Sequence, residues 1–228
     1  MPKNMKWFSL LIPLFYVLIG SVTIIKESEA VYLKLMEFCF NGAIITAIVI
    51  YFIKKSEVNT LYKLVVLFSF HVYLFILHHL VTYVPLSYYL HTEYLVSHPA
   101  IQFYNLNLIP FKTISDTFFW NLHTFTPVTV IQILGNALLM TPFAFALMFL
   151  GIIRNPIKLI IVMCSVSVLI ELIQFIETTI GLTARSTDID DVILNTFSGI
   201  IGVWIYYMFK LFSDKKQKFR SLRLKVGR

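Results

Sequence analysis

The hydrophobic positions of this chain are grouped into long continuous runs, and most polar residues lie between them. Each run is about 20 residues or longer, which is enough to cross about 30 Å of hydrocarbon as a helix. None shows the alternation of apolar and polar residues that a barrel strand requires. The pattern therefore predicts six membrane-spanning helices, over residues 7–25, 31–53, 61–84, 130–153, 157–180 and 189–212.

Composition supports this interpretation. Hydrophobic residues make up 58% of the 228 residues, charged residues 14%, and the mean hydropathy is +0.79, outside the range of soluble globular proteins. We expect an all-α, polytopic transmembrane bundle with little room for a soluble domain. Cys39 and Cys164 fall at different expected depths, so no disulfide is expected between them. Four regions follow: an N-terminal three-span region (1–85), an extracellular interfacial segment (86–129), a three-span core (130–212) and a basic cytoplasmic tail (213–228).

The positive charges predict the orientation in the cell membrane. Cytoplasmic loops of multi-pass proteins are enriched in Lys and Arg. With both termini inside, the outer segments hold few basic residues, namely Lys26, Lys34, Lys112 and Arg185. The basic tail, rather than nucleic acid, accounts for much of the net charge of +7, and it is expected to contact anionic headgroups. A small-x-small pattern at residues 28–30 leaves open a cleaved first span, with five spans remaining.

Polar residues of the last three expected spans share one depth, in the outer half of the membrane. Buried carboxylates are costly in lipid and face the bundle interior, where they are paired or wetted. The sequence therefore predicts an outward-opening polar cavity between these spans, with interhelical hydrogen bonding alone as the simpler alternative. The residues concerned are Asn136, Glu171, Gln174, Arg185, Asp188, Asp190, Asp191 and Asn195.

Two further features concern the same region. The glycines Gly135, Gly199 and Gly202 are expected to allow close helix packing, and Pro142 is expected to kink the fourth span. Residues 86–129, rich in aromatic residues and punctuated by Pro110 and Pro127, are expected to form short amphipathic helices on the outer interface, or to dip in and return.

Four ordered patterns resemble those of the VanZ-like family, named for a teicoplanin-resistance protein. They are NLIPF followed by KTI (107–114); Gly135-Asn136 with Pro142-Phe143; Glu171 with Gln174; and RSTDIDDVILN (185–195) with Gly202. The resemblance covers roughly residues 104–209. Ala144 and Ser198 stand where family members often have Gly. Positions matched to the family motifs include Asn107, Pro110, Phe111 and Pro142, besides the polar residues named above.

What the resemblance implies is a role in the bacterial cell envelope, associated with lowered susceptibility to teicoplanin and related lipoglycopeptides. The partners expected are membrane lipids and a lipoglycopeptide or lipid-linked precursor, bound without enzymatic activity. Two alternatives stay open: a membrane-embedded enzyme that modifies a lipid or cell-wall precursor, and a small ion-coupled transporter.

No motif selects a cofactor, a reaction or a metal. The aspartates 188, 190 and 191 with Glu171 offer oxygen ligands, but without the spacing of a calcium loop, so no metal is expected. Paired carboxylates suit general acid and base catalysis, yet nothing identifies a substrate. His71 and His78 lie on one helix face without an acidic partner on that helix, so both are expected to be core or interfacial residues.

Overall fold

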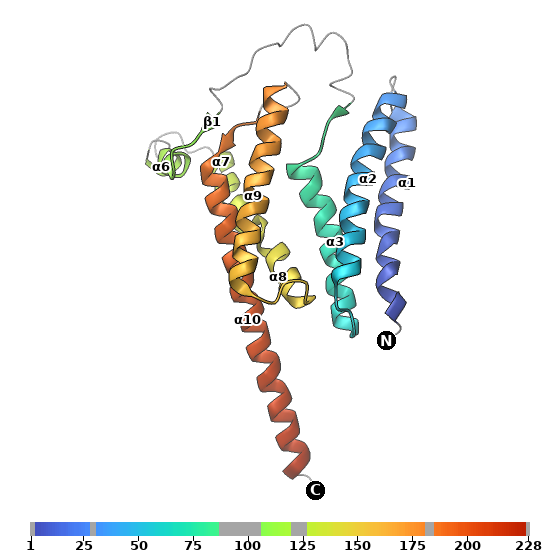
Figure 1. The fold of residues 1–228 in the computed structure, drawn as a ribbon, viewed down its shortest axis with the longest axis vertical. Coiled ribbons are helices and arrows are strands. Elements are labelled where there is room, and N and C mark those ends of the chain that lie inside the picture. Colours follow the sequence, from blue (N-terminus) through green and yellow to red (C-terminus); the bar gives the residue numbers. More distant parts are fainter. Residues whose placement is uncertain (1–2, 28–30, 87–105, 120–126, 181–184, 227–228) are drawn as a thin grey trace.

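The computed structural model describes residues 3–27, 31–86, 106–119, 127–180 and 185–226, whose long helices run mainly along one axis while the short helix α6 (Lys112–Phe119) lies across them (Figure 1). Within these residues, six helical segments are long and apolar enough to cross a membrane, as the sequence predicts. The all-α expectation is therefore confirmed. The helices are η1 (Lys3–Leu10), α1 (Leu11–Glu27), α2 (Val31–Lys55), α3 (Leu61–Val81), α6 (Lys112–Phe119), α7 (Pro127–Leu139), α8 (Thr141–Phe149), α9 (Pro156–Thr179) and α10 (Ile189–Val226).

Two of the spans begin with side-chain caps that the sequence encodes locally. Thr60 precedes α3 and accepts a hydrogen bond from the backbone N–H of Lys63. Asn155 does the same for Lys158 at the start of α9, where Pro156 occupies the first turn. Such caps satisfy backbone donors that the first turn of a helix leaves free. Thr60 and Asn155 therefore fix where α3 and α9 begin.

The fourth span is divided into α7 and α8 by a turn at Met140, two residues before Pro142. The interruption expected at this proline is therefore present. Two neighbouring helices hold the junction: the Tyr73 hydroxyl of α3 donates to the Leu139 carbonyl at 2.7 Å, and the Thr141 hydroxyl donates to the Ser198 carbonyl of α10 at 3.0 Å. These bonds connect the interrupted backbone to the bundle.

Helix α10 packs against α7, α8 and α9. A Cβ atom added at Gly202 would lie 2.5 Å from the Thr141 carbonyl oxygen and 2.8 Å from the Ala144 Cβ, so α8 and α10 touch closely there. At Gly199 the added atom would meet Met163 of α9 at 2.6 Å. The expectation for Gly135 was wrong, because that residue is exposed and nothing lies within 4 Å of its added Cβ.

The first three spans join this core through α8. Phe52 of α2, Phe70 of α3 and Phe143 of α8 form an aromatic cluster with ring centroids 5.1–5.9 Å apart. Just after the C-terminal end of α3, the Asn41 amide of α2 donates to the Val84 carbonyl at 2.9 Å and accepts from the Val84 N–H at 3.0 Å. This reciprocal pair holds the chain after α3 against α2.

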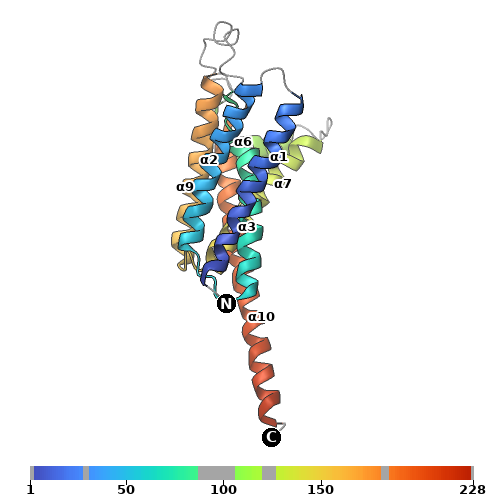
Figure 2. The same cartoon turned by 90° about the vertical axis from the view of Figure 1, so that its right-hand side faces the viewer.

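Both ends of the chain lie on one side of the bundle, and α10 continues well beyond it (Figure 2). The basic tail is thus helical to Val226 rather than separated from the sixth span. The short connections 56–60 and 150–155 lie at this same end, which we call the terminal end, and the start of α10 lies at the opposite end, which we call the loop end (Figure 1). The pattern at residues 28–30, and residues 87–105 and 120–126 of the interfacial segment, lie outside the described residues.

Candidate functional site

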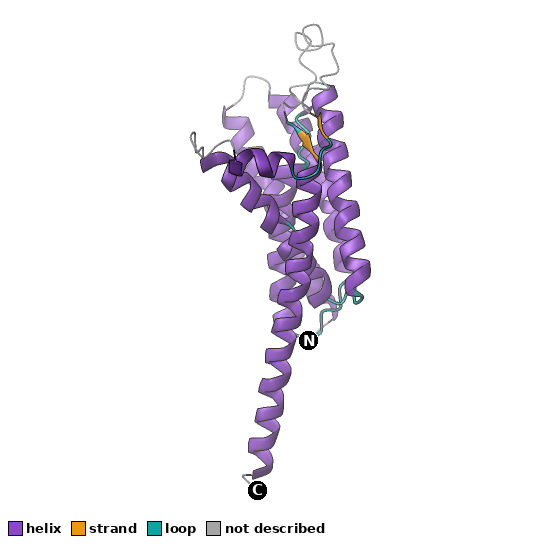
Figure 3. Ribbon diagram, turned by 90° about the vertical axis from the view of Figure 1, so that its left-hand side faces the viewer, coloured by secondary structure: helices purple, strands orange, loops and turns teal. Residues whose placement is uncertain are grey.

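Two short strands bring the interfacial segment to the start of α10 at the loop end. Strand β1 (Leu106–Asn107) pairs in parallel with β2 (Thr187–Asp188), with Leu106 opposite Thr187 and Asn107 opposite Asp188 (Figure 3). Among the described residues, these two segments are the β-strands. The pairing joins two of the sequence patterns, NLIPF and RSTDIDD, into one local structure.

Asp188 is the centre of this structure and is buried. Its carboxylate accepts hydrogen bonds from the Asn107 amide at 2.9 Å, from the Thr113 hydroxyl, and from the backbone N–H of Asp190 at 2.9 Å. The last of these caps the N-terminus of α10. Its own backbone N–H donates to the Glu171 carboxylate of α9 at 3.0 Å. Asp188 therefore ties the interfacial segment, α9 and α10 together.

Asp190 caps a helix to which it does not belong. Its two carboxylate oxygens accept the backbone N–H groups of Phe111 and Ile114, the latter at 3.1 Å. These residues form the N-terminal boundary and first turn of α6, where a negative charge also complements the helix dipole. Phe111 has a φ of 63°, the left-handed region that non-glycine residues rarely adopt. Asp190, only 1% exposed, stabilises that conformation.

The fourth span reaches the cluster through Asn136, whose amide donates to the Asp191 carboxylate. Asn195, four residues after Asp191 on the same face of α10, is buried, and its Oδ1 has no hydrogen-bond partner among the described residues. Asp188 and Asp191 are close enough to Glu171 to act on its charge. Carboxylates and amides from α7, α9 and α10 therefore gather at the loop end of the bundle.

Arg185 and Gln174 are placed differently from the acids. Both donate to the carbonyl oxygen of Val81, at 3.4 Å and 3.3 Å, and so satisfy the C-terminal end of α3. Among the described residues Arg185 forms no ion pair, although its charge still acts on Glu171 and Glu177. These two residues therefore link the cluster to the first three spans.

The segment held by the aspartates turns apolar side chains outward. We call this surface the apolar face; each of its members is more than half exposed, and they are Leu108, Ile109, Phe111, Phe118 and Phe119. Pro110 is also exposed, whereas Thr117 on the opposite side of α6 is buried. Helix α6 is thus amphipathic, as expected for this segment, and lies beside α7 and α10.

Each carboxylate oxygen of Asp188 and Asp190 accepts a hydrogen bond from the segment 107–114. A cavity of about 460 Å³ lies at the terminal end, lined by Lys63, Phe149 and Lys210 among others. Within the described residues, no three His, Cys, Asp or Glu side chains are arranged to hold a metal ion.

Two contributors to the cluster were absent from the site residues chosen from the sequence. Thr113, which lies within the quoted motif, donates its hydroxyl to Asp188. The other is the Val81 carbonyl, which has no sequence signal because any residue supplies that atom. Buried His71, with both ring nitrogens unpartnered among the described residues, belongs to the bundle interior as expected.

A family match covers the part of the chain that contains this cluster. Residues 68–210, more than half of the chain, match the model of the VanZ/LLP1 family. No curated protein and no solved structure matches the chain. The matched stretch runs from α3 to α10 and includes the residues that hold α6, β1 and β2 together. This chain, a membrane protein whose described residues include six apolar helices long enough to span a bilayer, belongs to the VanZ/LLP1 family.

Proposed function

We propose that this protein binds a lipid-anchored molecule at the outer surface of a bacterial cell membrane, through the apolar face, and thereby lowers susceptibility to teicoplanin-type lipoglycopeptides. Both termini are then cytoplasmic, and the loop end is outside. The observation that carries the proposal is the fastening of the 107–114 segment by Asp188 and Asp190, which holds exposed aromatic rings in a defined position.

Exposed apolar side chains grouped on one short segment at a membrane boundary suit an acyl chain, because the chain leaves water or disordered lipid for fixed aromatic contacts. Phe118 and Phe119 are 53% and 76% exposed, although α6 has a side that packs against the bundle. A fixed platform loses less entropy on binding than a mobile one. The aspartates supply that rigidity, since they cap α6 and hold Phe111 in its unusual conformation.

The polar residues beneath the apolar face support the same proposal. Glu171, Asp191 and Asn195 each retain a side-chain oxygen without a described hydrogen-bond donor. Acceptors of this kind would pair with amide or hydroxyl groups of a peptide or sugar headgroup next to the acyl chain. The cluster is thus proposed to orient the molecule, and the apolar face to hold its tail.

The test is drug susceptibility of a deletion strain complemented with variants. Wild type should restore protection against teicoplanin more than against vancomycin, which carries no acyl tail. Daptomycin, an acylated peptide, tests whether the tail alone suffices. Phe118→Ser with Phe119→Ser should abolish protection, as should Asp191→Ala. Phe212→Ser, at the terminal end and 70% exposed, is the matched control and should leave protection intact.

Protein amounts in the membrane are measured by immunoblot for every variant. Unchanged teicoplanin susceptibility in the deletion strain, or in the Phe118 and Phe119 variants, would contradict the proposal. Mass spectrometry of lipids and cell-wall precursors in the same strains addresses the enzymatic alternative, because a species that depends on the protein and on Asp191 would indicate catalysis.

A further inference from the structure

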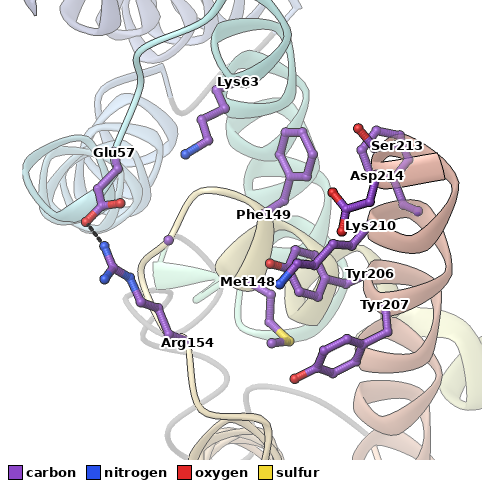
Figure 4. Close-up of a pocket in the computed structure, with 12 residues that line it drawn as sticks. Glu57, Lys63, Met148, Phe149, Arg154, Tyr206, Tyr207, Lys210, Ser213 and Asp214 are labelled. Atoms are coloured by element: carbon purple, nitrogen blue, oxygen red, sulfur yellow. Dashed lines mark hydrogen bonds and ion pairs between the residues drawn. The ribbon is translucent and has the colours of Figure 1, made fainter. Parts of the chain in front are cut away.

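The cavity at the terminal end lies between α3, α8 and α10 (Figure 4), whereas the polar cluster lies at the loop end. Its volume of about 460 Å³ is within the range of pockets that bind small molecules. Lys63 enters it from α3, Phe149 from α8, and Lys210 from α10. Helices distant in sequence therefore converge on one space.

One edge of the cavity is a firmly connected pair of loops. The backbone N–H of Glu57 donates to the Leu150 carbonyl at 2.9 Å, and the Glu57 carboxylate pairs with the Arg154 guanidinium. Gly151, with φ of 72°, lies against Glu57, where an added Cβ would be 2.8 Å from a carboxylate oxygen. The edge is thus built from specific contacts. Because Arg154 already pairs with Glu57, its positive charge is neutralised within the protein.

The charges left over are net positive, with two lysines against one acid. Neither Lys63 nor Lys210 forms an ion pair among the described residues. Both side chains line the cavity, with Asp214 as the remaining acid, one helical turn after Lys210 (Figure 4). An excess of ammonium groups around a partly enclosed space favours the binding of an anion there. The Ser213 hydroxyl, at the same end, offers a further donor.

Part of the cavity lining is aromatic. The Phe149 and Phe209 rings lie 5.4 Å apart, and Phe209 is 50% exposed. The span containing Phe149 ends at that residue, while the α3 span begins at Leu61, two positions before Lys63. The cavity therefore lies at the edge of the apolar spans, where headgroups meet acyl chains. A cavity that combines cations with aromatic rings matches an amphiphile better than a fully polar solute.

We propose that this cavity binds the phosphate-bearing headgroup of an anionic membrane lipid. Lys63 and Lys210 contact the phosphate, and the Phe149–Phe209 wall contacts the first carbons of an acyl chain. Lysine is well suited to phosphate as a point charge. This site is independent of the function proposed for the loop end, since no residue is shared.

The test uses the full chain reconstituted in nanodiscs that contain equal amounts of phosphatidylglycerol and phosphatidylcholine, followed by native mass spectrometry of the lipids that the released protein retains. Wild type should retain phosphatidylglycerol preferentially. Lys63→Gln with Lys210→Gln should weaken this retention by about tenfold, the size expected for loss of charge-assisted hydrogen bonds. The matched control is Lys54→Gln with Lys158→Gln, two exposed lysines at the same end that do not line the cavity.

Three results would overturn the proposal. One is equal retention of the two lipids by wild type, which requires no variant. Another is an equal loss in the test and control pairs, which would indicate nonspecific surface charge. The third is displacement of the lipid by glycerol 1-phosphate at low concentration, which would assign the cavity to a soluble phosphate ester. Lys63→Arg with Lys210→Arg should keep the preference if charge in the cavity is its cause.

Discussion

Asp190, in the first turn of α10, accepts the backbone N–H of Phe111, a residue with left-handed backbone geometry at the start of α6. Through this contact a carboxylate of one helix shapes the N-terminus of another. The same carboxylate accepts the Ile114 N–H, so both donors lose their partner if the acid is removed. The relationship makes the α6 region dependent on α10.

Replacing Asp190 with Ala should loosen α6 while leaving the rest of the bundle folded. Loss of a capping side chain costs about 1–2 kcal/mol, so hydrogen exchange of residues 106–119 should accelerate by about tenfold. Exchange mass spectrometry in nanodiscs measures this change. The control is Asp116→Ala, an exposed acid on α6 without a described hydrogen bond. Equal exchange in both variants would contradict the capping role.

Phe111→Gly should separate the effect of the backbone conformation at position 111 on stability from the effect of the aromatic ring on ligand binding. Glycine adopts positive φ without steric cost, so the thermal midpoint should stay unchanged or rise slightly, by the equivalent of about 1 kcal/mol. The variant loses an aromatic ring from the apolar face, so teicoplanin protection should fall. A clear loss of thermal stability would show that the ring packs for stability, which its 58% exposure argues against.

Asn136 and Asp191 should be energetically coupled. Their hydrogen bond joins α7 to α10, and such bonds within membrane proteins contribute about 0.6–1.7 kcal/mol. A double-mutant cycle of Asn136→Ala and Asp191→Ala, measured by unfolding in mixed micelles, should therefore give a coupling of about 1 kcal/mol. Purely additive effects would mean that the contact does not contribute to stability.

Gly202→Ala should destabilise the protein, whereas Gly135→Ala should not. The new methyl group at position 202 would collide with the Thr141 carbonyl oxygen and Ala144, at a cost of about 1–3 kcal/mol. At position 135 the methyl group meets open space, and Ala favours the helix. Thermal midpoints in detergent compare the two. Equal midpoints would show that α8 and α10 are separated more widely in the membrane.

The orientation is tested by impermeant thiol labelling of intact cells. Ser186→Cys at the loop end should react from outside, and Asn59→Cys at the terminal end should react only after permeabilisation. The expectation rests on the positive-inside distribution of charge. The two native cysteines, which are exposed on the helices, are first replaced by Ser. The reverse labelling pattern would place the apolar face in the cytoplasm and remove the basis of the proposed function.

The number of spans could be predicted from the sequence because each helix in lipid must satisfy its own backbone and present apolar side chains over a fixed length. The grouping of Asn136, Glu171 and the aspartates 188–191 was also predictable, since counting along each span placed them at one depth. The caps of α3 and α9 are encoded in adjacent residues, Thr60 and Asn155, and need no distant contact.

What the carboxylates do depended on tertiary structure. Helical periodicity placed Asp188 and Asp190 beside a proposed cavity, but it did not connect them with residues 107–114. That segment is distant in sequence and does not belong to the same helix, so counting residues along α10 cannot reveal the contact. Gly135 illustrates the same limit, since a glycine signals a possible close approach and not the neighbour that makes it. The charge of Arg185 acts on Glu171 and Glu177, but its hydrogen bond to the Val81 carbonyl at the end of α3 has no signal in the sequence. Hydropathy depends on local composition and therefore determines spans. Hydrogen-bond partners depend on which backbone ends meet, and only the packed bundle decides that.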